Sequence, residues 1–151
     1  MTREERLAQA DRLAARMDRL ETFAQAATML LALIPIAYGV LTWIYGAQLW
    51  SDSTAYSTAL STPFAPQSWG TIFIASGLTV VWSGWRDHAR CVMLSTGTSA
   101  FILAMFMSMF VTEFVQHPDK EGALPPALVY AVLSMLFLAR ARMAWASLKD
   151  G

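Results

Sequence analysis

Charge is scarce in this chain and absent from four long stretches of it. Only 15% of the residues are Asp, Glu, Lys or Arg, whereas soluble domains carry about 25%. Residues 22–51, 53–85, 91–112 and 122–139 contain none. An uncharged, mainly apolar stretch of about 18 residues or more predicts a membrane span, because about 20 helical residues cross a bilayer core. A soluble fold needs polar helix faces, which these stretches lack, so we predict an integral membrane protein.

A single cysteine, zero net charge and missing motifs exclude further classes. Cys91 has no second cysteine for an internal disulfide or a cysteine-based zinc site, and we expect it to be a reduced, packing residue. The arginines are interleaved with acids, which argues against a nucleic-acid surface. The chain has no Gly-rich phosphate loop, metal-helix motif or nucleophile elbow. We therefore expect no enzyme, no cofactor, no metal and no nucleic-acid partner.

The apolar pattern predicts an all-α, four-transmembrane-helix bundle. The spans are placed at 24–49, 69–86, 91–113 and 124–143, after a helix at 1–23 and before a tail at 144–151. Trp and Tyr favour the headgroup level of a bilayer, and they mark the span ends at Trp43, Tyr45, Trp50, Trp69, Trp82, Trp85 and Trp145. Pro125 and Pro126 precede the fourth span, where a missing N–H costs little.

The distribution of Lys and Arg predicts the orientation. The two termini and the loop 86–90 hold Arg3, Arg6, Arg12, Arg16, Arg19, Arg86, Arg90, Arg140, Arg142 and Lys149. The loops 51–68 and 114–123 hold only Lys120. Cytoplasmic loops carry the excess of positive charge, so both termini are predicted in the cytoplasm. Arg86, Arg90, Arg140 and Arg142 are then the anchors at the inner, cytoplasmic surface of the membrane.

The first 23 residues are predicted to form a helix that continues into the first span. Apolar residues follow a heptad seam formed by Leu13, Met17, Leu20, Ala24, Ala27, Leu31 and Ile34. Charge is balanced in residues 1–21 and no large aromatic residue precedes Phe23, unlike a lipid-binding helix. Two interpretations remain open: the helix packs on a second copy or another membrane protein, or it is a solvated extension.

Small residues form a packing face on each span. In a bilayer, helices associate through close contacts at such residues. The first three faces consist of Ala32, Gly39 and Gly46; of Gly70, Gly77 and Gly84; and of Thr96, Ala100, Ala104 and Ser108. These faces serve packing within the chain or between copies. Pro35 lies inside the first span and predicts a kink or a hydrogen-bond gap.

Few residues are candidates for ion coupling or metal binding. No ionisable residue lies in the middle of a predicted span, which argues against proton or ion coupling. Glu113 and His117 are four residues apart at the outer surface; we expect a solvated pair in preference to metal ligands. Met105 and Met109 share a helix face, where packing is favoured over Cu(I) binding. The Ser/Thr-rich loop 51–68 is expected to be a flexible or lightly folded connector.

The segment FAPQSWGTIFIASGLTVV (64–81) resembles a pattern in small membrane proteins of actinobacterial phages, where a proline-bearing loop leads into a span through an aromatic–Gly pair. The layout of four spans, a charged N-terminal helix and a basic tail is also similar, and nine Arg against two Lys fits a GC-rich genome. The resemblance implies a holin-like protein that associates and permeabilises the inner membrane. AYGVLTWIYG (37–46) resembles the first span of the small fourth subunit of actinobacterial cytochrome oxidases. A non-catalytic accessory subunit and a phage exclusion protein therefore remain alternatives.

Overall fold

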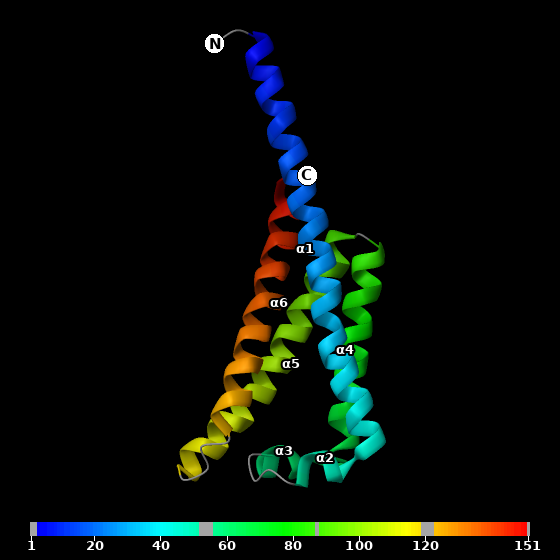
Figure 1. Cartoon of the computed structure of the whole chain (residues 1–151), viewed down its shortest axis with the longest axis vertical. Helices are drawn as coiled ribbons and strands as arrows, with labels where there is room; N and C mark the ends of the chain where they lie inside the picture. The colour runs from blue at the N-terminus through cyan, green and yellow to red at the C-terminus, as the bar shows by residue number, and fades with distance from the viewer. Residues whose placement is uncertain (1–2, 52–55, 87, 119–122, 151) are drawn as a thin grey trace.

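The structure is a computed structural model that describes residues 3–51, 56–86, 88–118 and 123–150. Over these ranges the chain is helical and contains no strand, which confirms the predicted all-α class. The helices are α1 (Arg3–Tyr45), α2 (Ala47–Ser51), α3 (Ser57–Leu60), α4 (Gln67–Arg86), α5 (Ala89–Gln116) and α6 (Leu124–Asp150). The four long helices run lengthwise, and the short α2 and α3 lie across one end of them (Figure 1).

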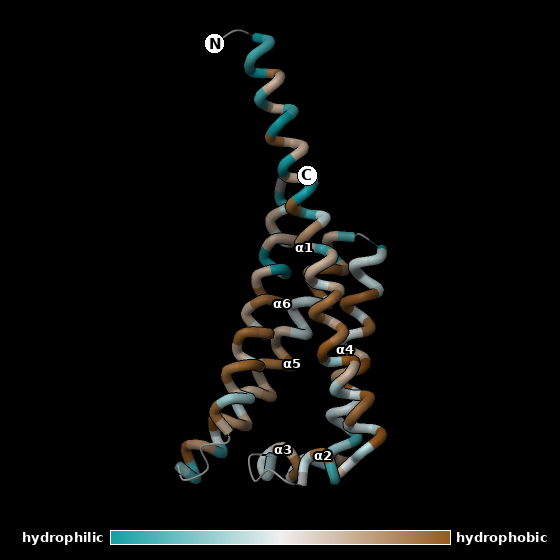
Figure 2. The backbone as a smooth tube through the Cα atoms, in the orientation of Figure 1, coloured by the Kyte–Doolittle hydropathy of each residue, from teal (hydrophilic) through white to brown (hydrophobic). Residues whose placement is uncertain are grey.

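Three of the long helices, α1, α5 and α6, are long and apolar enough to cross a membrane. Apolar residues dominate the bundle, whereas the projecting part of α1 is largely hydrophilic (Figure 2). Helix α4 is not among the three, because its 20 residues mix Ser, Thr, Gly and Trp with Ile, Leu and Val. The chain is thus compatible with a multi-pass membrane protein, and a crossing by α4 stays a prediction.

Helix α1 contains both the predicted N-terminal helix and most of the first predicted span in 43 residues. It continues through Pro35 and ends at Tyr45 rather than at residue 49. Gly46 has a φ of 53°, a left-handed conformation that glycine adopts readily at helix ends. A Cβ at Gly46 would meet only Gln67 Nε2, at 3.7 Å. Gly46 therefore ends α1 and does not have the packing role predicted for it.

The long helices form two pairs. Helix α1 packs along α4 and α5 packs along α6, while a smaller α4–α5 contact joins the pairs. Helices α1 and α6 meet over only a few residues, so the bundle is loosely closed on that side. Helix α6 continues beyond residue 143 through most of the predicted tail, as far as Asp150, and its last turns approach α1 near Glu21 (Figure 1).

Glycine and alanine bring the backbones of α1 and α4 together. A Cβ added at Gly39 would lie 2.5 Å from the carbonyl oxygen of Gly70, and one at Gly77 would lie 2.7 Å from that of Ala32. Such close approach is typical of small-residue helix packing. A Cβ at Gly84 would lie 2.8 Å from the Met29 side chain. The structure thus places five of the predicted packing residues at one interface within the chain.

The predicted stripe on α5 lies only partly at a helix interface. Thr96 and Ala100 are buried, Ala104 is half-buried and Ser108 is exposed. With about 3.6 residues per turn, each four-residue step turns about 40° further around the helix. The stripe therefore starts in the interface and has left it by Ser108, whose hydroxyl donates to the Met105 carbonyl.

Serine hydroxyls join the remaining helix contacts. Ser76 of α4 and Ser99 of α5 hydrogen-bond at 2.8 Å, and Ser83 and Ser95 do so at 2.6 Å. Ser134 of α6 donates to the Ala100 carbonyl of α5 at 2.8 Å. These bonds satisfy polar groups inside an apolar bundle, where an unpaired hydroxyl is costly.

Candidate functional site at the capped end of the bundle

Aromatic rings gather at the end of the bundle that α2 and α3 cover. This aromatic cluster consists of Tyr38, Trp50, Tyr56, Trp69, Phe73, Phe106, Phe110 and Tyr130. Phe106 is fully buried, and its ring centroid lies 4.9 Å from those of Trp69 and Tyr130 and 5.0 Å from that of Phe73. Tilted and edge-to-face pairs add about 0.5–1.5 kcal/mol each beyond burial. The cluster therefore ties the two helix pairs together.

Two buried indole groups link α2 and α3, which we call the cap, to the long helices. Trp69 Nε1 donates to the Ala59 carbonyl at 3.1 Å and to Thr62 Oγ1 at 2.9 Å. Trp50 Nε1 donates to Thr42 Oγ1 of α1 at 3.4 Å. A buried Trp ring needs such a partner for its N–H, so these bonds also fix the orientation of each ring.

The connector predicted at 51–68 is lightly folded, which is one of its two expected forms. Residues 56–66 consist of α3 and turns around it, and Ala59 is buried; residues 52–55 lie outside the described part of the chain. The segment has no apolar periodicity of its own. Its conformation depends on partners from distant helices, which a local pattern does not show.

Glu113 is the ionisable residue whose environment differs most from the prediction. Its side chain is 1% exposed, whereas that of His117 is 48% exposed, and His117 Nδ1 lies 3.3 Å from Glu113 Oε1. Ser57 Oγ and Thr58 Oγ1, the latter at 2.7 Å, both donate to Glu113 Oε2. The Glu113 carboxyl group is therefore not solvated, because α3 covers it and links the cap to α5, whereas the His117 imidazole remains half exposed.

Removal of the Glu113 carboxyl group is expected to loosen the cap. Glu113→Ala removes the acceptor of the Ser57 and Thr58 hydroxyls, and the loss of a hydrogen bond of this kind costs about 0.5–1.5 kcal/mol. Glu113→Gln keeps an oxygen that can accept from both, so its loss of stability should be smaller. Thermal unfolding in detergent, followed by Trp fluorescence, measures the difference; equal stability of the alanine variant and the native protein would contradict this account.

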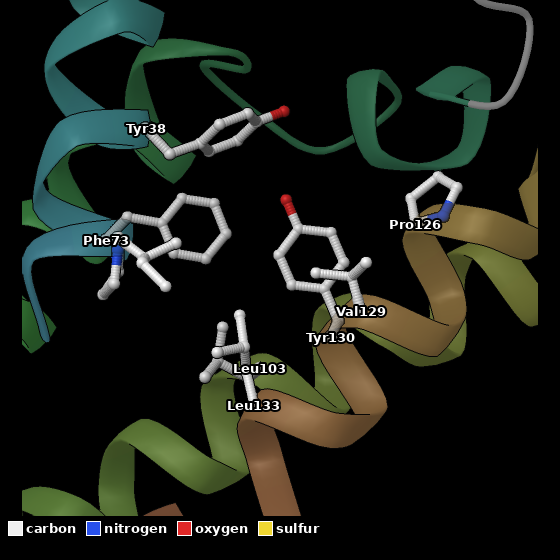
Figure 3. A pocket seen from close by; sticks show the side chains of 9 residues that line it. Tyr38, Phe73, Leu103, Pro126, Val129, Tyr130 and Leu133 are labelled. Atoms are coloured by element: carbon white, nitrogen blue, oxygen red, sulfur yellow. The ribbon is translucent and has the colours of Figure 1, made fainter. Parts of the chain in front are cut away.

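A cavity of about 300 Å³ lies between α1 and α6 beside the aromatic cluster. It is lined by Ile34, Pro35, Tyr38, Phe73, Leu103, Pro126, Val129, Tyr130 and Leu133. Figure 3 shows Tyr38 and Tyr130 on opposite sides with their hydroxyl groups turned toward each other. The remaining lining is apolar, so the cavity suits an apolar group such as an acyl chain or a helix side chain.

The methionines of α5 and the possibility of a metal site remain to be placed in the structure. Met107 and Met109 are partly buried against the hydrophobic core of the bundle, whereas Met105 is exposed. A search of the described residues finds no group of three His, Cys, Asp or Glu side chains that could hold a metal ion.

The predicted arginine anchors differ from one another. Arg86, Arg90 and Arg142 are exposed, and the Arg86 guanidinium lies 5.2 Å from the centroid of the Trp82 ring. Arg140 is only 8% exposed, so it is not a simple surface anchor. Periodicity could have indicated this difference, because Arg140 continues the buried positions Leu133 and Phe137 of α6.

Comparison with known proteins finds no similarity: no protein-family model, curated protein or solved structure matches the chain at a significant level.

Proposed function

We propose that the chain is a four-span protein of a bacterial cytoplasmic membrane, with both termini in the cytoplasm, that self-associates and permeabilises the membrane in the manner of holins. An exposed apolar seam on the N-terminal part of α1 carries this proposal. This part of α1 projects beyond the other helices (Figure 1). Leu13, Met17 and Leu20 on it are 54%, 68% and 62% exposed, so the seam is available to a helix of another chain.

The register of the seam favours a second copy as the occupant. With Met17 at heptad position a and Leu13 and Leu20 at d, Arg16 occupies g and Glu21 occupies e. In a parallel coiled coil, position g faces position e of the following heptad on the other helix. Arg16 of one copy therefore lies opposite Glu21 of another. Copies inserted in the same orientation present their N-terminal helices in parallel, as this pairing requires.

The same heptad positions lead toward the open side of the bundle. Ala24, Ala27 and Leu31 are half-buried, and the next position, Ile34, lines the cavity between α1 and α6. Association along α1 would thus place a second copy where each bundle is least closed. Separation of α1 from α6 within such an assembly is the step that we propose opens the membrane.

Tightly induced expression in a bacterial host tests the lesion. We expect growth and membrane potential to collapse together, at a reproducible time after induction, because holins accumulate before they act. Continued growth with an intact potential, despite confirmed membrane insertion, would contradict the proposal.

Polar residues on the seam are expected to prevent this collapse. Burial of each leucine contributes about 1.5–3 kcal/mol, so Leu13→Gln with Leu20→Gln should reduce the associated fraction by about tenfold or more. Ala8→Gln with Ala15→Gln is the matched control, because both alanines occupy position f, opposite the seam. Disulfide cross-linking of Met17→Cys in a Cys91→Ser background measures the association. Cross-links only to a different protein would instead indicate an accessory subunit.

A further inference from the structure

Arg140 is a buried cation at the end of the bundle opposite the cap. It lies on α6 and is 8% exposed. Its Nε atom is buried and has no hydrogen-bond partner among the described residues. Burial of a charged group without a partner is strongly unfavourable. A negatively charged group bound beside this guanidinium would offset that cost.

A small polar cavity of about 130 Å³ adjoins Arg140. It lies between three helices and is lined by Glu21 of α1, Ala89 and Val92 of α5, and Arg140, Ala144 and Ser147 of α6. The volume corresponds to about four water molecules at about 30 Å³ each. This is room for one tetrahedral oxyanion.

The N-terminus of α5 adds a second favourable feature to the cavity. Helix α5 has 28 residues and begins at Ala89, which lines the cavity. The N-cap residue His88 makes no side-chain capping hydrogen bond to the first turn; its Nδ1 lies 2.6 Å from the Arg86 carbonyl oxygen instead. The first N–H groups of a helix and its dipole favour an anion at this position.

Among the described residues, Glu21 is the one carboxylate that lines the cavity, and it opposes anion binding. Its side chain is exposed on α1, and the structure describes no ion pair between Glu21 and Arg140. The self-association proposed above uses Glu21 at heptad position e, directed toward Arg16 of another copy. On the described part of the chain, one guanidinium and the α5 N-terminus therefore face the cavity against one carboxylate at the rim.

We propose that Arg140 and the N-terminus of α5 bind a phosphate oxyanion in this cavity. The guanidinium donates to two phosphate oxygens, a geometry that arginine matches well. The phosphate comes either from an anionic phospholipid headgroup or from solution. The lipid source rests on the proposed membrane insertion, with this end at the cytoplasmic surface, but not on lesion formation.

Thermal unfolding of the full-length protein in neutral detergent tests the site. One arm adds inorganic phosphate, a second adds phosphatidylglycerol, and a third adds phosphatidylcholine as the zwitterionic control. We expect an increase in Tm that saturates with phosphatidylglycerol or with phosphate, and little increase with phosphatidylcholine. An increase with phosphatidylglycerol alone assigns a lipid headgroup, and an increase with inorganic phosphate alone assigns a soluble phosphate.

Variants separate a binding role of Arg140 from a structural one. Arg140→Gln should abolish the Tm increase while leaving the Tm without added anion unchanged or higher, because it removes an uncompensated buried charge. Arg140→Lys should weaken the apparent affinity by about tenfold, through loss of bidentate bonding. Glu21→Gln should strengthen binding, and Arg142→Gln, an exposed arginine on the same helix, should leave it unchanged.

Two results would overturn the proposal. The first is the absence of any Tm increase in both anionic arms. The second is an equal loss of stability in Arg140→Gln and Glu21→Gln without added anion, because Arg140 would then pair with Glu21. If Arg140→Gln does not fold, the lysine and Glu21 variants still give opposite changes in affinity. All of these measurements use purified protein and do not depend on growth or membrane potential. Failure of the anion site can therefore be distinguished from failure of the proposed lesion.

Discussion

Replacement of Gly77 by alanine is expected to destabilise the protein, and replacement by valine to disrupt the α1–α4 pair. A Cβ at this position would lie 2.7 Å from the Ala32 carbonyl oxygen and 2.4 Å from Ile36 Cγ1. The Ile36 side chain can move, but the carbonyl belongs to the backbone of α1, so the helices must separate. Overpacking of this kind costs about 1–3 kcal/mol, occasionally more. The free energy of unfolding in mixed micelles measures the effect.

Gly97→Ala is the matched control for the Gly77 variants. A Cβ at Gly97 would meet Ala141 Cβ at 3.9 Å, which is ordinary contact. Alanine stabilises a helix by about 1 kcal/mol relative to glycine, so Gly97→Ala should leave the stability unchanged or increase it. The two alanine substitutions are therefore expected to have opposite signs. A stabilising effect at both positions would show that α1 and α4 do not approach closely in the membrane.

Phe106→Ala is expected to cause the largest loss of stability among single substitutions in the aromatic cluster. Its ring contacts those of Trp50, Trp69, Phe73, Phe110 and Tyr130. Substitutions of buried Phe by Ala cost about 3–5 kcal/mol, because transfer energy is lost and a cavity remains. Loss of Phe106 should also release the cap. Quenching of Trp50 and Trp69 fluorescence by acrylamide would then increase.

Phe101→Ala on the same helix provides the control for Phe106→Ala. Phe101 is 69% exposed, so in the proposed orientation it contacts lipid, which can fill the space left by the ring. We expect a loss below about 1 kcal/mol and unchanged quenching. Similar losses at the two positions would mean that the aromatic cluster does not stabilise the bundle.

Local patterns predicted the long helices and the small-residue faces of α1 and α4, but not that these two helices pair. Uncharged apolar runs predict helices because the backbone must satisfy its own hydrogen bonds where water is absent. Glycines seven residues apart lie close to one helix face, so Gly70, Gly77 and Gly84 could be assigned to a packing surface before any partner was known. Periodicity of this kind describes one helix and needs no information about its neighbours.

The cap and the environment of Glu113 could not be predicted in the same way. That environment depends on Ser57 and Thr58, which are more than 50 residues away in the chain. For Arg140, the position at a predicted span end favours an exposed anchor, whereas the period of the buried positions Leu133 and Phe137 favours burial. Which of the two holds depends on how closely α1 and α5 approach α6 at that level.

The amino-acid sequence by itself determined the all-α class, the membrane-length apolar helices, the continuity of the N-terminal seam with α1 and the small-residue face of α4. These properties follow from the composition and period of single segments. Only the tertiary structure decided that α2 and α3 close one end over an aromatic cluster, that α1 and α6 leave a cavity between them, and that Glu113 and Arg140 are buried. The physical reason is that burial and hydrogen bonding of a side chain are properties of several segments together, and those segments are distant in sequence.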